Sequence, residues 1–195
     1  MTHFIYGFSL LWANRLDDAE KQLTETLERA ISVGDITLQS RCLTYLTLVH
    51  RKRGDVEAVE TCAGRSLQAA ETGGMTEYLA QANANLAWVA GRKGNLHELG
   101  QRSRAAIELW KLLPVPGPYV SMAWIAEWPA LGLAFQQGSL DEALAYARSL
   151  LEPDRQPMPQ DVSQSLRSAL NASEPSAARM HLGNVVRVAR LHGYL

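Results

Sequence analysis

The sequence of 195 residues lacks an excess of charge of either sign, since 19 Lys and Arg stand against 20 Asp and Glu. The formal charge of −1 argues against nucleic acid as a direct partner, because phosphate contacts need a strongly basic surface. Two cysteines, Cys42 and Cys62, are too few for a disulfide framework and favour free thiols in a reducing compartment. We therefore expect a cytoplasmic protein.

A leader segment and long apolar runs are missing as well. Residues 1–12 are apolar but lack the basic start and the small-residue cleavage site of a signal peptide. The most apolar stretch, 120–135, is interrupted by Glu127 and Pro129 and is shorter than the roughly 20 residues of a membrane-spanning helix. With 47% hydrophobic and 20% charged residues, the composition is typical of a globular chain. We expect no membrane association.

The motifs of common enzyme chemistry are also missing. The glycines of 91–94 lack the spacing of a phosphate-binding loop, and Leu11 stands where a nucleophile elbow would need its second glycine. No two of the five histidines are four residues apart, and none lies near a cysteine at metal-ligand spacing. The carboxylates at 17–18 and 141–142 fall where helices are predicted to begin, and there they stabilise the helix dipole. We expect no enzymatic activity, no metal and no cofactor.

What the sequence does contain is a recurring turn phrase, in which a small or turn-forming residue precedes a polar and then an apolar residue. The phrase begins at residues 14, 54, 94 and 138 and, more weakly, at 173, so the spacings are 40, 40, 44 and 35 residues. Glycine opens three copies, at Gly54, Gly94 and Gly138, and predicts left-handed helix ends. Asp55 and Ser139, which follow such glycines, are predicted to cap the next helix.

Helical periodicity flanks each phrase. In the first copy Ala19, Leu23, Leu27 and Ile31 are four residues apart, which places them on one helix face. A single helix–turn–helix hairpin cannot bury its apolar face, so neighbouring hairpins must stack. The sequence therefore predicts an all-α solenoid of about five hairpins, forming a single domain over residues 1–195. The hairpins are predicted at residues 1–35, 36–74, 75–113, 119–152 and 160–195.

All eight prolines lie at or after residue 114. Their clustering predicts rigid loops at 114–118 and 153–159, because proline cannot continue a helix. Pro129 lies inside a helical pattern and predicts either a kinked helix or a helix that begins late. Neither loop is long enough to predict a domain boundary.

This layout resembles the tetratricopeptide repeat. The family's small and apolar consensus positions are occupied by Gly7, Ala19, Thr26, Leu27, Thr47 and Ala87. The period near 40, longer than the usual repeat of about 34 residues, is similar to that of the C-terminal arrays of large bacterial signalling ATPases and transcriptional regulators. The resemblance implies a right-handed α-solenoid whose first helices line a concave groove.

The resemblance also implies where a ligand binds. The groove positions that it assigns as binding residues are Arg41, Thr44, Leu48, Arg51, Lys52, Asn85, Trp88, Arg92 and Trp128. Such a groove is basic in its middle, which suits carboxylates, and offers Trp88 as an aromatic anchor. The alternative is that the basic residues are solvated helix ends and that Trp88 belongs to the core.

The first predicted helix is apolar all round, which is typical of a helix buried on every side. A terminal repeat should instead have a polar outer face. We therefore predict that upstream repeats of a longer array, or a second copy of the chain in a homodimer, cover this helix. The predicted contact residues are Phe4, Ile5, Phe8, Leu11 and Trp12. At the other end, Arg187, Arg190 and Tyr194 are typical of a capping helix.

Two functions follow from these expectations. The first is a protein–protein interaction scaffold with a protein or peptide partner, serving as the C-terminal sensory or assembly segment of a larger regulator. The second is a sensor of a small effector molecule held by Trp88, Trp124, Trp128 and the arginines. A closed pocket of roughly a few hundred Å³ with converging polar groups favours the sensor, and an open trough favours the scaffold.

Overall fold

The chain is described by a computed structural model that covers residues 2–113, 122–153, 155 and 157–195. Within these residues the structure is built from α-helices, which confirms the predicted all-α class. The helices are α1 (Thr2–Trp12), α2 (Leu16–Ser32), α3 (Ile36–Arg53), α4 (Val56–Gly73), α5 (Thr76–Arg92), α6 (Leu96–Lys111), α7 (Trp124–Gln137), α8 (Leu140–Ser149), α9 (Gln160–Leu170) and α10 (Pro175–Leu191). The loop predicted at 114–118 lies outside the described residues.

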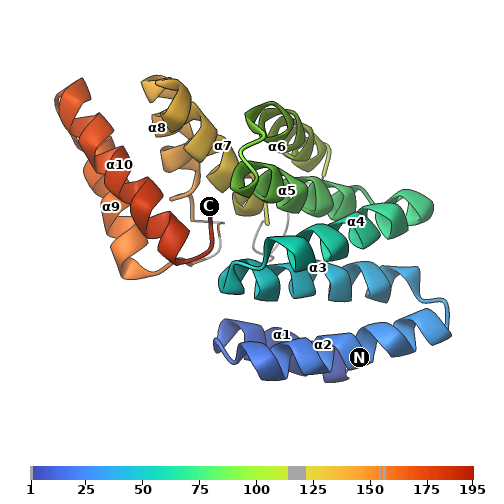
Figure 1. Cartoon of the computed structure of the whole chain (residues 1–195). Coiled ribbons are helices and arrows are strands. Elements are labelled where there is room, and N and C mark those ends of the chain that lie inside the picture. Colours follow the sequence, from blue (N-terminus) through green and yellow to red (C-terminus); the bar gives the residue numbers. More distant parts are fainter. Residues whose placement is uncertain (1, 114–121, 154, 156) are drawn as a thin grey trace.

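The helices stack in pairs along a curved array. Each helix packs against the next one in sequence, and α1, α3, α5 and α7 also contact one another in order, so that they form a row of their own. Figure 1 shows the pairs following one another from α1 and α2 to α9 and α10, with the C-terminal end on the inner side of the curve. The row of α1, α3, α5 and α7 therefore lines the concave face.

The turn phrases form the helix ends that their residues predict. Gly54, Gly94 and Gly138 have φ angles of 73°, 76° and 79°, so all three are left-handed, as expected. Asp55 caps α4 by accepting a hydrogen bond from a backbone N–H of the first turn. The capping prediction is wrong for Ser139, whose side chain makes no such bond to α8.

The prediction that one face of α2 is buried is confirmed for three of the four residues assigned to it. Ala19, Leu23 and Leu27 are buried, whereas Ile31 is 48% exposed and Ala30 is buried in its place. With about 100° of rotation per residue, each step of four residues advances the face by about 40°, so Ile31 lies about 120° from Ala19. Ala30, eleven residues after Ala19, returns to within about 20° of it.

The last helix pair departs from the regular stacking. In a regular array α9 would pack on both helices of the preceding pair, but here α9 contacts α8 while α10 packs against both α7 and α8. The chain therefore leaves α10 next to the concave row. Figure 1 places its C-terminal end in the space surrounded by α3, α5, α7 and α10.

One apolar core connects the helix pairs. A continuous cluster of buried side chains runs from Phe4 in α1 through Leu131 in α7 to Val185 in α10. Pro129 is buried inside α7, five residues after the helix begins at Trp124. Among the described helices, none combines the length and the apolarity that crossing a membrane requires.

Candidate binding site on the concave face

The concave face is occupied by the chain's own residues 192–195, which we call the tail. After α10 ends at Leu191, the tail turns back across the row of α3, α5 and α7. The ring of Tyr194 stacks on Trp128, with centroids 5.1 Å apart and planes 5° apart. Trp124 meets the same ring edge-on at 5.7 Å. Two tryptophans of α7 thus form a slot that holds one aromatic side chain of the tail.

Close backbone approach fixes the tail on α3. Gly193 has a φ of +73°, and a Cβ atom at this position would lie 2.7 Å from the carbonyl oxygen of Arg51. Such a distance is far inside van der Waals contact, so only glycine lets the tail backbone lie here. Leu195 packs comparably close to α7, since a Cβ on Gly132 would lie 3.0 Å from its Cδ2.

Arg51 joins α3, α5 and the tail by hydrogen bonds. Its Nη1 donates to Oδ1 of Asn85 at 3.0 Å, and its Nη2 donates to the main-chain carbonyl of Tyr194 at 3.0 Å. Asn85 in turn donates through Nδ2 to the hydroxyl of Thr47 at 3.3 Å. The Arg51 guanidinium also lies over the Trp88 ring, 5.4 Å from its centroid. The tail is therefore recognised through a main-chain group as well as through a side chain.

The charge of Arg51 is buried without a counter-charge. Arg51 is 2% exposed, and it forms no ion pair with a carboxylate in the part of the chain that the structure describes. Burial lowers its pKa to about 9, although nearby Tyr194 acts in the opposite direction, so the guanidinium stays protonated at pH 7. Burial likewise raises the pKa of Tyr194 to about 12. Buried charges are ordinarily paired, so an arginine held by neutral acceptors marks this face as unusual.

The tail changes where the predicted groove residues lie. Six of the nine are at most 5% exposed: Thr44, Leu48, Arg51, Asn85, Trp88 and Trp128. Arg51 is thus buried under the tail instead of lining an open surface, and it is no solvated helix end either. Arg41, Lys52 and Arg92 are exposed. Arg41 lies apart from the others and donates to the hydroxyl of Tyr78 at 2.8 Å.

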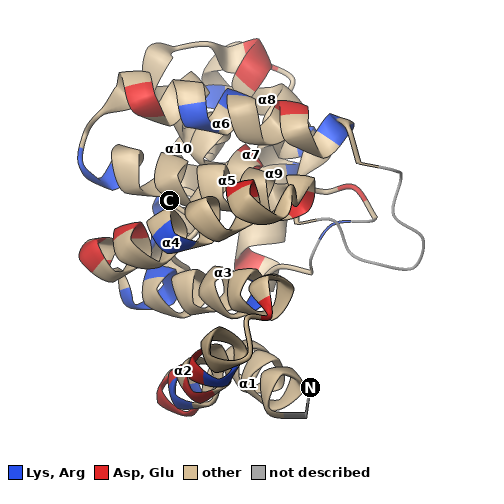
Figure 2. Ribbon diagram, turned by 90° about the vertical axis from the view of Figure 1, so that its right-hand side faces the viewer, with Lys and Arg blue, Asp and Glu red and all other residues tan. Residues whose placement is uncertain are grey.

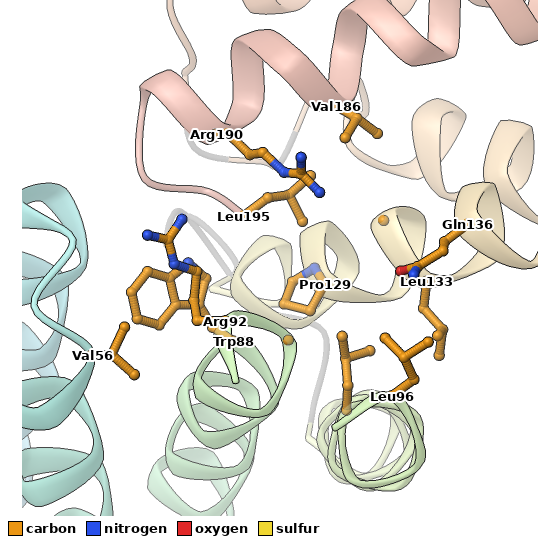
Figure 3. Close-up of a pocket in the computed structure, with 13 residues that line it drawn as sticks. Val56, Trp88, Arg92, Leu96, Pro129, Leu133, Gln136, Val186, Arg190 and Leu195 are labelled. Carbon is orange, nitrogen blue, oxygen red and sulfur yellow. The ribbon is translucent and has the colours of Figure 1, made fainter. Parts of the chain in front are cut away.

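A pocket of about 370 Å³ remains open beside the tail. Its apolar lining comes from Val56, Leu96, Leu99, Pro129, Leu133 and Val186. Its polar lining comes from Trp88, Arg92, Gln136 and Arg190. Figure 3 shows Trp88 and Arg92 at one end, Gln136 at the other, and Arg190 with Leu195 between them. The tail therefore supplies part of the pocket wall through Leu195.

Sequence reasoning missed the tail. Tyr194 was expected to belong to a capping helix, but α10 ends at Leu191 and Tyr194 lies on the concave face. The signal available in the sequence is Gly193, which follows a helical run and permits a sharp reversal just before an aromatic and an aliphatic residue. Gly193 predicts a turn after the helix, but it does not predict which surface the tail contacts.

The predicted contact residues of α1 fall into three groups. Phe4 and Leu11 are 7% and 0% exposed and belong to the core, where Phe4 packs against Tyr45 of α3 at 5.6 Å between ring centroids. Phe8 and Trp12 are half-buried. Ile5 is 51% exposed, as is its neighbour Tyr6. Figure 2 shows α1 without a single charged residue. The uncovered apolar surface of α1 is thus smaller than the sequence predicts.

One buried carboxylate lies away from the tail. Glu127 of α7 is 6% exposed, accepts a hydrogen bond from Ser149 at 2.8 Å and pairs with Arg155 at 3.0 Å. Burial raises its pKa, while Arg155 and Ser149 act to lower it. The described residues include no cluster of three His, Cys, Asp or Glu side chains that could hold a metal ion. The Glu127 carboxylate is best explained as a structural group that links α7 to α8 through Ser149 and to the following segment through Arg155.

No protein-family model matches the chain, and no match was found among curated proteins.

Proposed function

We propose that the chain is an interaction module that holds an extended segment of a protein partner on its concave face. The observation that carries this proposal is that the face already holds a short non-helical segment, Tyr194 and Leu195, which follow the turn at residues 192 and 193 of the tail. Arg51 binds a main-chain carbonyl of the tail, and Trp128 stacks on the ring of Tyr194. A foreign segment in which glycine precedes an aromatic residue can offer the same two groups, because the glycine permits the close approach to α3 and the aromatic residue supplies the ring and the carbonyl.

The finer architecture is part of this proposal. We infer a right-handed solenoid of five tetratricopeptide-like hairpins that serves as the C-terminal sensory or assembly segment of a larger bacterial signalling or transcriptional regulator. The spacing of the turn phrases, the resemblance of consensus positions such as Gly7 and Thr47, and the row of α1, α3, α5 and α7 support it. The departure of α9 and α10 from regular stacking brings the tail to the concave face.

A peptide in trans tests the binding proposal. The probe is a synthetic peptide with the sequence of residues 189–195, titrated by calorimetry into a full-length Tyr194→Ser variant whose own tail binds poorly. We expect saturable one-to-one binding to the variant and none to the wild-type chain. A control peptide in which serine replaces the tyrosine should not bind. A well-folded variant that fails to bind the tyrosine peptide contradicts the proposal.

A second contact of the module is proposed at the outer face of α1, where the chain would meet another copy of itself. The support is the exposure of Ile5 and Tyr6 on a helix that has no charged residue. Sedimentation velocity over a range of concentrations tests it. We expect a dimer that the double substitution Ile5→Ser/Tyr6→Ser converts to a monomer. A wild-type chain that stays monomeric at high concentration contradicts this contact.

A second candidate function, sensing of a small effector molecule, is favoured by the pocket beside the tail. Its volume of about 370 Å³ falls within the roughly 300–1,000 Å³ of ordinary ligand sites. Polar groups from α5, α7 and α10 border the same apolar space. Thermal unfolding in the presence of a small-molecule panel tests this function. If no compound of the panel changes the melting temperature, the proposed sensing of a small molecule is contradicted.

A further inference from the structure

We propose that the pocket between Trp88 and Gln136 binds a small apolar carboxylate, which Arg92 and Arg190 hold by its charged group. This proposal rests on the second function proposed above, the sensing of a small molecule, and adds the chemical class of the ligand. We call this cavity the arginine pocket, and its charged lining is Arg92 and Arg190.

The charge of the lining points to an anion. Within the described residues, neither Arg92 nor Arg190 forms an ion pair with a carboxylate, and the described lining includes no Asp or Glu. Buried Arg51 also lacks an acidic partner, and both Arg51 and Arg92 lie over the Trp88 ring, at 5.4 and 5.5 Å. Three arginines of this face therefore have no Asp or Glu side chain paired with them among the described residues. A carboxylate matches the planar donor fork of arginine in two parallel hydrogen bonds.

The remaining lining points to an apolar body. Leu96, Leu99 and Leu133 present aliphatic side chains to the pocket, and Pro129 adds a ring edge. An apolar carboxylate satisfies both kinds of lining with one molecule.

Ligand binding in this pocket is linked to the position of the tail. Leu195 belongs to the tail and lines the pocket. A ligand that contacts Leu195 therefore binds the pocket more tightly when the tail lies on the concave face (the docked state) than when the tail has left it (the released state). Because the ligand binds the docked state more tightly, it shifts the equilibrium toward that state. The shift in free energy is set by the difference between its affinities for the docked and the released state. A bound carboxylate is therefore expected to slow hydrogen exchange of the tail amides.

Calorimetry on the full-length chain with matched probes tests the proposal. The probes are octanoate, 4-phenylbutyrate and naphthalene-1-acetate, each paired with its neutral amide. We expect at least one carboxylate to bind with a Kd below about 1 mM and at least tenfold more tightly than its amide, a difference of about 1.4 kcal/mol. Arg190→Gln should weaken that carboxylate at least tenfold. Arg187→Gln removes the same charge from another exposed position of α10, outside the pocket lining, and should leave binding unchanged.

The outcomes separate the ligand class from the sensing function. If an amide binds as tightly as its carboxylate and Arg190→Gln has no effect, the anionic class is overturned while small-molecule binding stands. If none of the six probes binds, the carboxylate class is overturned, whereas the sensing function is overturned only if the small-molecule panel also leaves the melting temperature unchanged. If Arg187→Gln weakens binding as much as Arg190→Gln does, the carboxylate responds to the general charge of α10, and the arginine pocket is overturned as its site.

Discussion

Tyr194 lies flat against Trp128, with ring planes 5° apart and centroids at 5.1 Å. This contact joins the segment after the last helix to the fourth helix pair, and it brings the main-chain carbonyl of Tyr194 within 3.0 Å of the Arg51 guanidinium. The stacked ring and the Arg51 hydrogen bond therefore act together to hold the tail across the concave face.

Replacing Tyr194 by alanine should release the tail. The substitution removes the contacts with Trp128 and Trp124, and we expect the free energy of unfolding to fall by about 2–3 kcal/mol. Urea denaturation followed by circular dichroism measures this loss. Tyr194→Phe keeps the stacked ring and should stay within about 0.5 kcal/mol of the wild type. Equal losses from both variants would show that the hydroxyl, and not the stacking, holds the tail.

Alkaline pH should destabilise the docked tail. The pKa of Tyr194 is raised to about 12 in the folded chain by burial, whereas an unfolded tyrosine ionises near its ordinary value of about 10. The contribution of this residue is therefore complete below pH 10 and is lost as the pH rises from about 10 to about 12. The loss approaches about 2–3 kcal/mol.

Other tyrosines titrate in the same range, so the comparison with Tyr194→Phe isolates the effect. Burial raises the pKa of Tyr45 to about 12 as well, and that contribution is common to both chains. We expect the stability of the wild type to fall more steeply than that of Tyr194→Phe between pH 10 and 12. Parallel curves would mean that Tyr194 ionises at its ordinary pKa and is not buried.

A methyl group at residue 193 should displace the tail from α3. Gly193→Ala places a Cβ 2.7 Å from the Arg51 carbonyl, in a left-handed conformation that alanine already disfavours. Gly34→Ala is the matched control, because Gly34 has a similar φ of +70° and open space around its Cβ position. Denaturation should show a loss of about 1 kcal/mol for the control and about 1–2 kcal/mol more for Gly193→Ala. Identical losses would mean that the tail does not approach α3 closely.

Two carboxylates that contact Arg155 should differ sharply in their contribution to stability. Glu127→Ala removes the buried one of the carboxylates that contact the largely buried Arg155 guanidinium, and we expect a loss of about 3 kcal/mol. Glu152 contacts the same guanidinium at 3.2 Å, but its side chain is 52% exposed, so Glu152→Ala should cost less than about 1 kcal/mol. Chemical denaturation of the two variants provides the comparison. If Glu152→Ala lowered the free energy of unfolding more than Glu127→Ala does, the contact between Glu127 and Arg155 would have to be exposed to solvent.

The helices and their ends could be predicted because their causes are local. Left-handed glycines such as Gly54 and the Asp55 cap depend on a few neighbouring residues, and the regular spacing of the turn phrases predicts stacked hairpins. The misplacement of Ile31 has a local cause too. A spacing of four drifts around a helix of 3.6 residues per turn, so periodicity alone becomes misleading after three steps.

The candidate site could be predicted only in part, because its decisive contact is remote in sequence. Arg51 and Trp88 were identified from the groove positions of a resembling family, and both do lie on the concave face. Arg51 is covered through its contact with Tyr194, which is 143 residues away, whereas Trp88 packs with Val59 of α4. The burial of Arg51 also follows from the irregular packing of α10 on α7, which no local pattern specifies. Periodicity predicts which face of a helix is buried, but not which distant segment covers it.

The most direct test of the account is a nuclear Overhauser measurement in solution between the ring protons of Tyr194 and the indole protons of Trp128. Selective labelling of tyrosine and tryptophan, with Tyr194→Phe used for assignment, makes the pair observable. If the tail occupies the concave face, strong cross-peaks join the two rings and the Tyr194 resonances are shifted upfield by stacking. Tyr194 resonances at random-coil positions, with no cross-peak to Trp128, would contradict the account.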